Sequence, residues 1–380
     1  MEYRDFGTAI DFEPSALGFG AMRLPTEGEE GTIDRQHAID MIRAAIDEGV
    51  NYVDTAWPYH DGESERVVGE ALTGDYREDV SLATKMPSWK LETNEDLEEY
   101  FQRQLDRLAT DHVECYLLHA LDEEFWNTYQ ELDTFEWLER KQAAGEIGHV
   151  GFSFHDDLDL FEEIVDTYDW DFCQIQYNYL DQQFQAGRAG LEYAAERGLG
   201  VVVMEPLRGG TLATDLPDPV CEAFEEADSE RSPVEWALQW LWDQPEVSTV
   251  LSGMSTLEQV RENVDLAAQS GVGQFSESDL QTVQRARERF EELMAVDCTG
   301  CDYCMPCPTG VDIPGNFDLY NRLETSDDPT AVLDEYEQLD EHARADACVA
   351  CGECEPACPQ NLEIISLLEE THARLDAVRA

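Results

Sequence analysis

The segment Asn51-Tyr-Val-Asp54-Thr-Ala-Trp-Pro-Tyr59 contains a short apolar run that ends in polar residues and a loop. Runs of this kind occur eight times between residues 16 and 270, where they alternate with amphipathic stretches. Their almost continuous apolar character predicts strands that are covered on both faces. The eight runs are Ala16–Leu24, Tyr52–Thr55, Val80–Lys85, Val113–His119, Val150–Phe154, Phe172–Tyr177, Val201–Leu207 and Val247–Ser252.

Eight strand–helix units predict a parallel sheet that closes into a (β/α)8 barrel, the TIM barrel of the α/β class. The alternative is an open, doubly wound sheet, which would need a glycine-rich phosphate turn after its first strand. Here the first strand leads instead into Arg23-Leu-Pro-Thr26. The closed barrel is therefore the predicted fold.

Capping residues predict where several helices begin and end. Ser232-Pro-Val-Glu235 has capping-box spacing and a proline at the first helical position. Ser276 is a suitable cap for a last barrel helix that extends to Ala295. Three glycines lie where helices are expected to stop, namely Gly49, Gly145 and Gly198.

The charge of the chain is strongly negative, with 84 acidic and 24 basic residues and a net charge of −60. Residues 296–380 contribute −15 and residues 1–295 contribute −45, so the excess is not a local tail. Such a surface repels nucleic acid and anionic membranes, and we expect neither as a partner. Salt near 1 M, where the Debye length is about 3 Å, would screen the self-repulsion. The composition therefore predicts a halophilic protein, with an ordinary acidic enzyme as the alternative.

The sequence shows no sign of membrane insertion or secretion. No run of about 20 apolar residues is present, and Met1-Glu-Tyr-Arg-Asp5 lacks the basic start and apolar run of a signal peptide. We therefore expect a cytoplasmic protein. Cysteines stay reduced there, so clustered cysteines indicate metal ligands rather than disulfides.

Four titratable residues lie where a barrel places its reactive groups. Asp54, Lys85 and His119 end the second, third and fourth apolar runs, and Tyr59 lies in the loop after the second. Barrel active sites form at the C-terminal strand ends, and burying such groups is costly unless they are paired. Singly, each could be a helix cap or a core residue. Together they predict a catalytic site.

These residues lie in three blocks that resemble the tetrad blocks of the aldo-keto reductases. The blocks are Asn51–Tyr59, Leu82–Lys85 and Tyr116–His119, and the segment Ala16–Pro25 is also similar. The resemblance extends over residues 1–295, with order and spacing maintained throughout. It implies nicotinamide-dependent reduction of a carbonyl group.

The resemblance also implies a role for each of the four residues. Tyr59 would protonate the carbonyl oxygen as a general acid. A phenol, whose ordinary pKa is about 10, is a weak acid at neutral pH, and a nearby ammonium stabilises its phenolate. Lys85 would supply this ammonium and be held by Asp54, while His119 would orient the carbonyl.

Residues that would contact the nicotinamide half of the cofactor follow from the same resemblance. Ser153 and Gln174 match the family's carboxamide ligands. The asparagine of the family is replaced by Phe154, and its stacking tyrosine by Met204, whose thioether is polarizable but less rigid. The implied set is Gly20, Ala21, Met22, Ser153, Gln174, Met204, Pro206 and Leu207.

The segment Leu251–Asn263 resembles the family's adenosine-binding segment, and an ordinary strand–loop–helix is the alternative. The basic residues that many members direct at the 2′-phosphate are replaced by Gly253 and Gln259. The sequence therefore leaves NADP and NAD both open as the cofactor, with Arg261 as a possible phosphate ligand. The implied contacts are Ser252, Gly253, Met254, Gln259, Glu262 and Asn263.

Eight of the eleven cysteines form two runs, which we call the first run and the second run. They are Cys298-x2-Cys301-x2-Cys304-x2-Cys307-Pro308 and Cys348-x2-Cys351-x2-Cys354-x3-Cys358-Pro359. Structural zinc, the alternative, more often uses paired C-x2-C hooks. The pattern resembles two-cluster ferredoxins, in which the fourth cysteine of each run binds the other cluster.

By this resemblance, two 4Fe–4S clusters are held by crossed sets of ligands. One set is Cys298, Cys301, Cys304 and Cys358, and the other is Cys348, Cys351, Cys354 and Cys307. The first run departs from the ferredoxin pattern because two residues instead of three precede its last cysteine. Residues 296–380 are thus predicted to form a small α-rich ferredoxin-type domain, with helices over Phe317–Leu323 and Val332–Leu339.

The complete chain is similar to aldo-keto reductases that carry a C-terminal ferredoxin-type domain. The resemblance implies an oxidoreductase that reduces small carbonyls, or oxidises alcohols, with NAD(P)H. Its clusters would transfer electrons to or from a soluble carrier such as ferredoxin. The alternative is a non-catalytic redox sensor, in which the barrel binds a nucleotide and the clusters respond to redox state.

Overall fold

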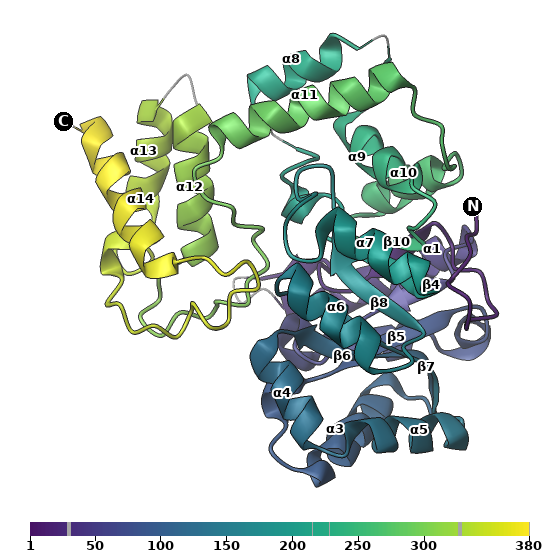
Figure 1. Ribbon diagram of the computed structural model, residues 1–380. Coiled ribbons are helices and arrows are strands. Elements are labelled where there is room, and N and C mark those ends of the chain that lie inside the picture. Colours follow the sequence, from purple (N-terminus) through teal and green to yellow (C-terminus); the bar gives the residue numbers. More distant parts are fainter. Residues whose placement is uncertain (29–31, 215, 228, 326–328, 380) are drawn as a thin grey trace. The chain divides into compact units, whose positions relative to one another are not determined.

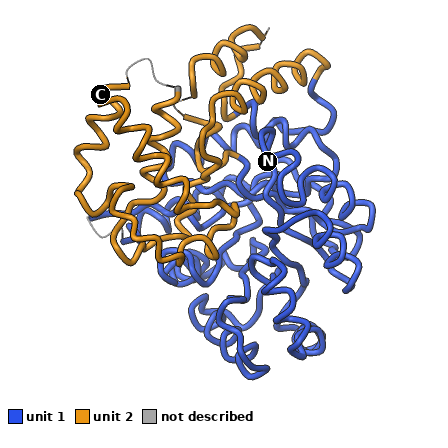
Figure 2. Tube along the Cα trace, turned by 60° about the vertical axis from the view of Figure 1, so that its left-hand side comes forward, with its two compact units in different colours: residues 1–206, 235–275 blue, residues 207–234, 276–380 orange. Residues whose placement is uncertain are grey.

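The computed structural model describes residues 1–28, 32–214, 216–227, 229–325 and 329–379. The chain divides into two units, and neither is continuous in sequence. Unit 1 comprises Met1–Pro206 and Glu235–Phe275, and unit 2 comprises Leu207–Val234 and Ser276–Ala380 (Figure 2). The structure thus groups residues 207–234 with the cysteine-containing region, although they precede it by many residues.

Unit 1 contains a closed barrel of eight parallel strands, as the sequence predicted (Figure 1). The order around the barrel is β1-β10-β9-β8-β7-β6-β5-β4, and β1 closes it by pairing with both β10 and β4. A separate antiparallel pair is formed by β2 (Thr26–Glu27) and β3 (Thr32–Ile33). The barrel strands are β1 (Leu17–Gly20), β4 (Tyr52–Asp54), β5 (Ser81–Met86), β6 (Val113–Leu121), β7 (Ile147–Phe154), β8 (Phe172–Gln176), β9 (Gly200–Met204) and β10 (Thr249–Gly253).

Helices follow the strands and cover them through their apolar faces. In α3, for example, the buried positions Leu97, Phe101, Leu105 and Leu108 recur at helical spacing. The helices that belong to the barrel sequence are α1 (Arg35–Asp47), α2 (Ser64–Ala71), α3 (Asn94–Leu108), α4 (Glu123–Glu131), α5 (Thr134–Ala144), α6 (Leu158–Thr167), α7 (Gly187–Glu196), α9 (Pro233–Trp242) and α10 (Leu257–Ala267).

The predicted helix starts agree with the structure, and the last predicted barrel helix ends at Leu293, before the predicted Ala295. Helix α9 begins at Pro233, and α11 (Glu277–Leu293) begins with a capping box between Ser276 and Asp279. Gly145 is the left-handed C-cap of α5, with φ of 74°, a conformation that costs glycine little. Local capping chemistry therefore determines these ends.

A buried apolar cluster lies below the residues at the C-terminal strand ends. It includes Tyr52, Ala83, Cys115, Leu117, Phe172, Val202 and Leu251. Side chains two positions apart on a strand share a face. Five of these core residues are followed, two positions later towards the C-terminal strand end, by a candidate site residue. These five candidate residues are Asp54, Lys85, His119, Gln174 and Met204. Because side chains alternate between the two faces of a strand, all five side chains face the barrel interior.

Unit 2 is helical among its described residues. Helices α12 (Ile313–Thr325), α13 (Pro329–Gln338) and α14 (Ile364–Arg379) pack on one another (Figure 1), and α8 (Asp218–Glu225) packs on α11. The predicted helices at residues 317–323 and 332–339 are present, the first of them longer than expected at both ends. A single apolar core, centred on residues such as Phe317, Tyr320 and Leu368, lies among α12, α13 and α14.

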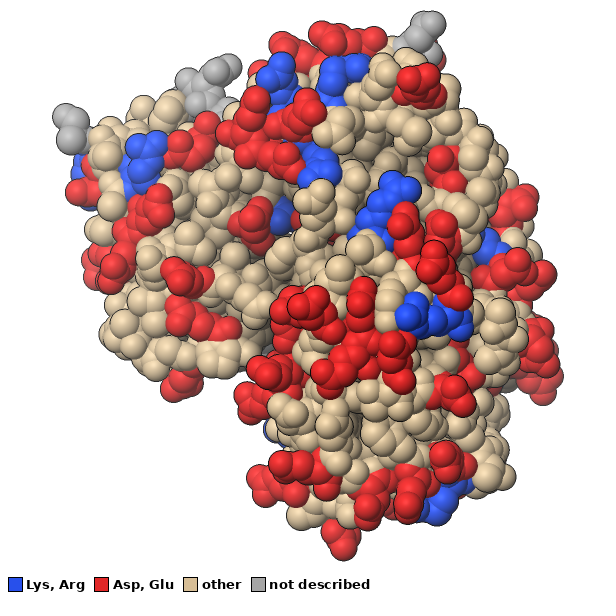
Figure 3. Space-filling model, in the orientation of Figure 1, with Lys and Arg blue, Asp and Glu red and all other residues tan. Residues whose placement is uncertain are grey.

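Acidic side chains are spread over the face that Figure 3 shows, and basic side chains are few. Most of the arginines form ion pairs, such as Arg35 with Glu63 and Glu70. Among the described residues, no helix is both long and apolar enough to cross a bilayer.

Candidate active site

Lys85 lies at the centre of the candidate site in unit 1. Its side chain is fully buried, and Nζ lies 2.6 and 2.7 Å from the two carboxylate oxygens of Asp54. Nζ also donates to the Thr55 carbonyl oxygen at 2.9 Å and lies 3.4 Å from the Tyr59 hydroxyl. The His119 ring is edge-on to the Tyr59 ring, with centroids 6.2 Å apart. The four residues selected from the sequence therefore lie together.

Local irregularities of the backbone place two of these side chains. The pairing of β6 with β7 shifts register between Leu118 and Leu121, and Ala120 has a positive φ of 53°. Such bulges redirect a side chain at a strand end, and this one follows His119 directly. Tyr59 begins a short 3₁₀ segment in which His60 and Asp61 are left-handed. Strained backbone of this kind is concentrated at functional sites.

Burial dominates the electrostatics of these groups. Burial raises the pKa of Asp54 and lowers the pKa of Lys85, and the charge of each partner opposes the shift of the other. Burial, followed by the charges of Lys85 and His155, holds the pKa of His119 well below its ordinary value. His119 is therefore a neutral imidazole at neutral pH, which can donate a hydrogen bond without carrying a charge.

A buried ion pair behind the site was not predicted from the sequence. Glu65 is fully buried and accepts hydrogen bonds from Arg107 at 2.9 Å, and from Thr84 and Gln104 at 2.8 Å. The Arg107 guanidinium stacks on the Trp57 ring, 3.5 Å from its centroid. Because Trp57 precedes Tyr59 by two residues, this network supports the loop that carries the phenol.

The proposed carboxamide ligands lie at the same end of the barrel. Ser153 Oγ accepts a hydrogen bond from the Ala120 amide at 2.7 Å, so it is tied to the bulge after His119. Gln174 Nε2 lies 3.4 Å from Met204 Sδ. Gln174 Oε1 is buried and has no hydrogen-bond partner among the described residues. A buried acceptor without a donor is costly, and the amide group of a nicotinamide would supply that donor.

Phe154 does not occupy the place that its position in the sequence suggested. The Phe154 ring packs on Phe161 of α6, with centroids 5.1 Å apart. The Phe152 ring also packs on Phe161. Ser153 lies between these two outward residues, and His155 is the next residue on the inward face. His155 Nδ1 lies 3.3 Å from Gln185 Nε2. His155 therefore joins the candidate site, and the period of two along the strand is the signal that identifies it.

The partly buried ring of His155 predicts a pH dependence of stability. Burial lowers its pKa to about 4, against an ordinary value of 6.5. The unfolded chain therefore takes up the proton first, and this contribution to the unfolding free energy is lost as pH falls from about 6.5 to about 4. The loss is at most about 3 kcal/mol. In urea unfolding at fixed salt concentration, His155→Gln should lose less stability than the wild-type protein over this range. Equal losses in the two proteins would contradict the assignment.

The proposed adenosine contacts are partly buried and partly exposed. Asn263 donates to Ser252 Oγ at 3.1 Å and both residues are buried, whereas Gln259, Arg261 and Glu262 are exposed on α10. A side chain at Gly253 would meet the Arg23 side chain at 3.1 Å. Arg23, which the sequence reasoning did not select, therefore lies where the family often has a lysine. It also lies 3.8 Å from Glu205.

In unit 2, four cysteines of the predicted crossed set line one small cavity. They are Cys298, Cys301 and Cys304 of the first run and Cys358 of the second, and the other walls include Ile313, Phe317 and Ile364. Burial and the neighbouring thiols raise the pKa of Cys304 to about 12. Thiolate ligands around an apolar cavity suit a 4Fe–4S cluster.

The second cysteine set is less defined. Cys307, Cys348 and Cys354 all pack against the apolar core of unit 2, and Cys351 is exposed. Cys307 Sγ lies 3.4 Å from the Thr309 hydroxyl. Within the described residues, no three His, Cys, Asp or Glu side chains are close enough to hold a single metal ion. The membership of Cys307 in the second set therefore stays a prediction.

Comparisons with known proteins cover both parts of the chain. A sequence profile of the aldo/keto reductase family matches residues 16–288, and one of a 4Fe-4S dicluster domain matches residues 297–363. The uncharacterized oxidoreductase YqkF of Bacillus subtilis is 29% identical over 296 residues, covering 70% of this chain and 91% of that protein. The NADH-specific methylglyoxal reductase of Escherichia coli is 27% identical over 302 residues, with 67% and 90% covered.

A solved structure shows the same similarity. The holo form of the aldo-keto reductase AKR11C1 from Bacillus halodurans superposes with a TM-score of 0.63 at 27% sequence identity. The match covers 75% of this chain and 96% of that one.

Proposed function

The chain belongs to the aldo/keto reductase family and carries a 4Fe-4S dicluster domain, and from this premise we propose that it reduces small aldehydes and ketones, or oxidises the alcohols, with NAD(P)H. One observation carries the proposal. A single buried ammonium, that of Lys85, lies within hydrogen-bond distance of both the Asp54 carboxylate and the Tyr59 hydroxyl. This arrangement suits a phenol that must lose and regain a proton.

In the proposed mechanism, the chain's own residues orient the carbonyl and deliver the proton. The Tyr59 hydroxyl donates its proton to the carbonyl oxygen as negative charge develops there. Lys85 stabilises the resulting phenolate, and Asp54 keeps Lys85 charged and in position. Neutral His119 donates a hydrogen bond to the same oxygen. Trp89, whose ring lies 5.3 Å from that of His119 and is partly exposed, provides an apolar wall for the substrate.

We propose that Ser153, Gln174 and Met204 hold the nicotinamide, with Gly20, Ala21 and Met22 at the end of β1, and with Pro206 and Leu207 after β9. The orphaned Gln174 Oε1 supports this assignment because it lacks a hydrogen-bond donor among the described residues. The nicotinamide, when bound, supplies the hydride to the carbonyl carbon. The adenosine half is assigned to Ser252–Met254, Gln259, Glu262 and Asn263.

The proposed adenosine site predicts little discrimination between NADPH and NADH. Gly253 and Gln259 carry no charge, and a charge-assisted contact to phosphate contributes about 1.5–3 kcal/mol. We expect the kcat/KM values for NADPH and NADH to differ by less than about a hundredfold. Each tenfold difference corresponds to about 1.4 kcal/mol of free energy. Gln259→Arg should shift the ratio towards NADPH by at least about tenfold. A strong NADPH preference in the wild-type protein would show that Arg23 or Arg261 already binds the phosphate.

Carbonyl turnover is the direct test of the proposed function. Methylglyoxal and a small aliphatic aldehyde would be offered with NADH and with NADPH, anaerobically and in molar salt, and cofactor oxidation measured. Turnover with either substrate supports the enzyme. Nucleotide binding without turnover of any carbonyl offered would favour the redox sensor instead.

We propose that unit 2 binds two 4Fe–4S clusters through the crossed ligand sets. The cavity lined by Cys298, Cys301, Cys304 and Cys358 supports the first set, and the second set follows from the ferredoxin resemblance. The clusters, when bound, supply one-electron transfer, for which a soluble carrier such as ferredoxin is the proposed partner. Zinc content in place of iron and sulfide would overturn this assignment.

We further propose that the protein works in the cytoplasm at high salt. None of the eleven cysteines forms a disulfide, which suits a reducing compartment. The net charge of −60 is spread over the chain, and molar salt screens it.

A further inference from the structure

A buried arginine in unit 2 lies at the start of a strained turn. Arg208 is 2% exposed and has a positive φ of 48°, and the following residues Gly209 and Gly210 also have positive φ values. A non-glycine residue in this region of backbone space is uncommon and persists only when its surroundings hold it. Arg208 also directly follows Pro206-Leu207, the segment proposed to contact the cofactor.

The Arg208 side chain contacts the segment that leads into the first cysteine run. Nη2 lies 3.2 Å from Asp297 Oδ1, and Nη1 lies 3.3 Å from Met294 Sδ. Asp297 is the residue immediately before Cys298. The backbone strain at Arg208 is therefore balanced by contacts with one end of the proposed cluster site.

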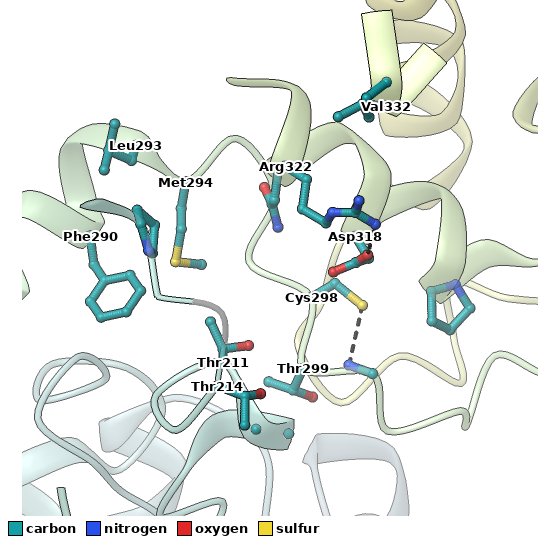
Figure 4. A pocket seen from close by; sticks show the side chains of 17 residues that line it. Thr211, Thr214, Phe290, Leu293, Met294, Cys298, Thr299, Asp318, Arg322 and Val332 are labelled. Carbon is teal, nitrogen blue, oxygen red and sulfur yellow. Dashed lines mark hydrogen bonds and ion pairs between the residues drawn. The ribbon is translucent and has the colours of Figure 1, made fainter. Parts of the chain in front are cut away.

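Because Asp297 and Cys298 are neighbours in the chain, the Arg208 guanidinium lies beside the segment that carries this proposed ligand. The Gly300 amide donates to Cys298 Sγ at 3.4 Å. Cys298 also forms part of the wall between two cavities. One is the cysteine-lined cavity, and the other, of about 750 Å³, is bounded by the loop Gly209–Thr214 and by Cys298–Gly300 (Figure 4).

The Arg208 and Asp297 charges differ in exposure to solvent, and this difference decides which of them acts more strongly on Cys298. The Arg208 side chain is 2% exposed, whereas the Asp297 side chain is 71% exposed. Charges in a buried, low-dielectric place act more strongly than charges that water and salt screen. The net field at Cys298 from this pair is therefore positive, in a chain whose overall charge is strongly negative.

We propose that Arg208 is the residue that sets the reduction potential of the cluster held by Cys298, Cys301, Cys304 and Cys358. One-electron reduction adds a negative charge to a 4Fe–4S cluster, with no bond formed or broken. A buried cation beside one ligand stabilises the reduced form and raises the potential. The inference rests on the cluster assignment under the proposed function.

The test is a dithionite titration of the anaerobic, iron-loaded full-length protein in molar salt, followed by electron paramagnetic resonance. The signal of this cluster is identified as the one absent from Cys358→Ser. Arg208→Gln should lower the reduction potential of this cluster. At a fixed potential the oxidised-to-reduced ratio should rise at least tenfold, which corresponds to a shift of about 59 mV for a one-electron couple. Arg208→Lys should retain most of the wild-type potential. The second cluster should keep its potential in both variants.

Asp297→Asn should shift the reduction potential in the opposite direction. It carries little risk to folding, because this side chain is mostly exposed. Removing the carboxylate removes one negative charge beside the guanidinium and beside Cys298, so the potential of the same cluster should rise. If Arg208→Gln loses its iron, the Asp297→Asn variant tests the role of Arg208 instead. Full iron content with no shift, or with equal shifts of both clusters, would overturn the role of Arg208.

Two parallel measurements separate this inference from the proposed function. Iron and sulfide analysis of the wild-type protein tests the cluster assignment, and absence of iron would overturn both proposals. Carbonyl turnover tests the barrel chemistry alone. Potential shifts of the expected sign in a protein that reduces no carbonyl would support the role of Arg208 while removing the reductase.

Discussion

Tyr59→Phe is expected to lower carbonyl turnover by about 10²–10⁴-fold, the usual contribution of a general acid, while nucleotide affinity stays nearly unchanged. The variant removes one hydroxyl, which lies 3.4 Å from Lys85 Nζ. The ring should remain in place because it is buried beside His119. Steady-state rates and a nucleotide-binding titration on the same preparation would separate the loss of chemistry from a loss of binding.

A matched control for this variant is Tyr76→Phe. Tyr76 also belongs to unit 1, but its hydroxyl lies near the surface, 3.5 Å from Asp47. Removing it should leave turnover unchanged. A Tyr59→Phe protein that retains a near-normal rate would remove Tyr59 from the mechanism, whatever the result for the control.

Cys358→Ser is expected to remove the cluster of the first run, although Cys358 belongs to the second run in sequence. The thiol shares a cavity with Cys298, Cys301 and Cys304, and a serine oxygen is a poorer ligand for iron than a thiolate. Iron should fall from about eight to about four per chain, the pattern of two-cluster ferredoxins. Iron analysis and paramagnetic resonance would measure the loss.

Cys307→Ser is the reciprocal experiment. If the ligand sets are crossed, this variant should disturb the cluster of Cys348, Cys351 and Cys354 and spare the one that contains Cys298. Loss of the same cluster in both variants would contradict the crossed arrangement. Four irons in the intact wild-type protein would rule out a second cluster.

The barrel was predictable because its strands are covered on both faces and its helices have clear caps. Continuous apolar runs identified all eight barrel strands, and Ser232-Pro233 and Ser276 marked helix starts that the structure shows. Two runs, Ala16–Leu24 and Val201–Leu207, extended at least three residues beyond the C-terminal ends of their strands. Backbone turns explain both, because β1 ends at Gly20 before a turn, and β9 ends at Met204 before the left-handed Glu205.

The candidate site was only partly visible in the sequence. Residues at strand ends, such as Lys85 and His119, could be selected because polar groups there interrupt apolar runs, whereas Gln174 was selected through the family resemblance alone. Glu65 and Arg107 lie on surrounding helices, where charged residues are ordinary, and nothing local shows that Glu65 is buried or that the two form an ion pair. His155 was overlooked because similarity in sequence pointed to its neighbour Phe154, whereas strand alternation decides which of the two faces inwards.

The division of unit 2 between two separate stretches has a consequence for the order of events on the ribosome. Residues 207–234 are synthesised before β10, and their partners in unit 2 begin only at Ser276. Domains generally form from the N-terminal side as the chain emerges, at about 5–20 residues per second. Helix α8, whose buried residues include Val220 and Phe224, therefore waits for α11 to be translated. We expect nascent chains that end before Ser276 to leave this segment open to proteases and to chaperones.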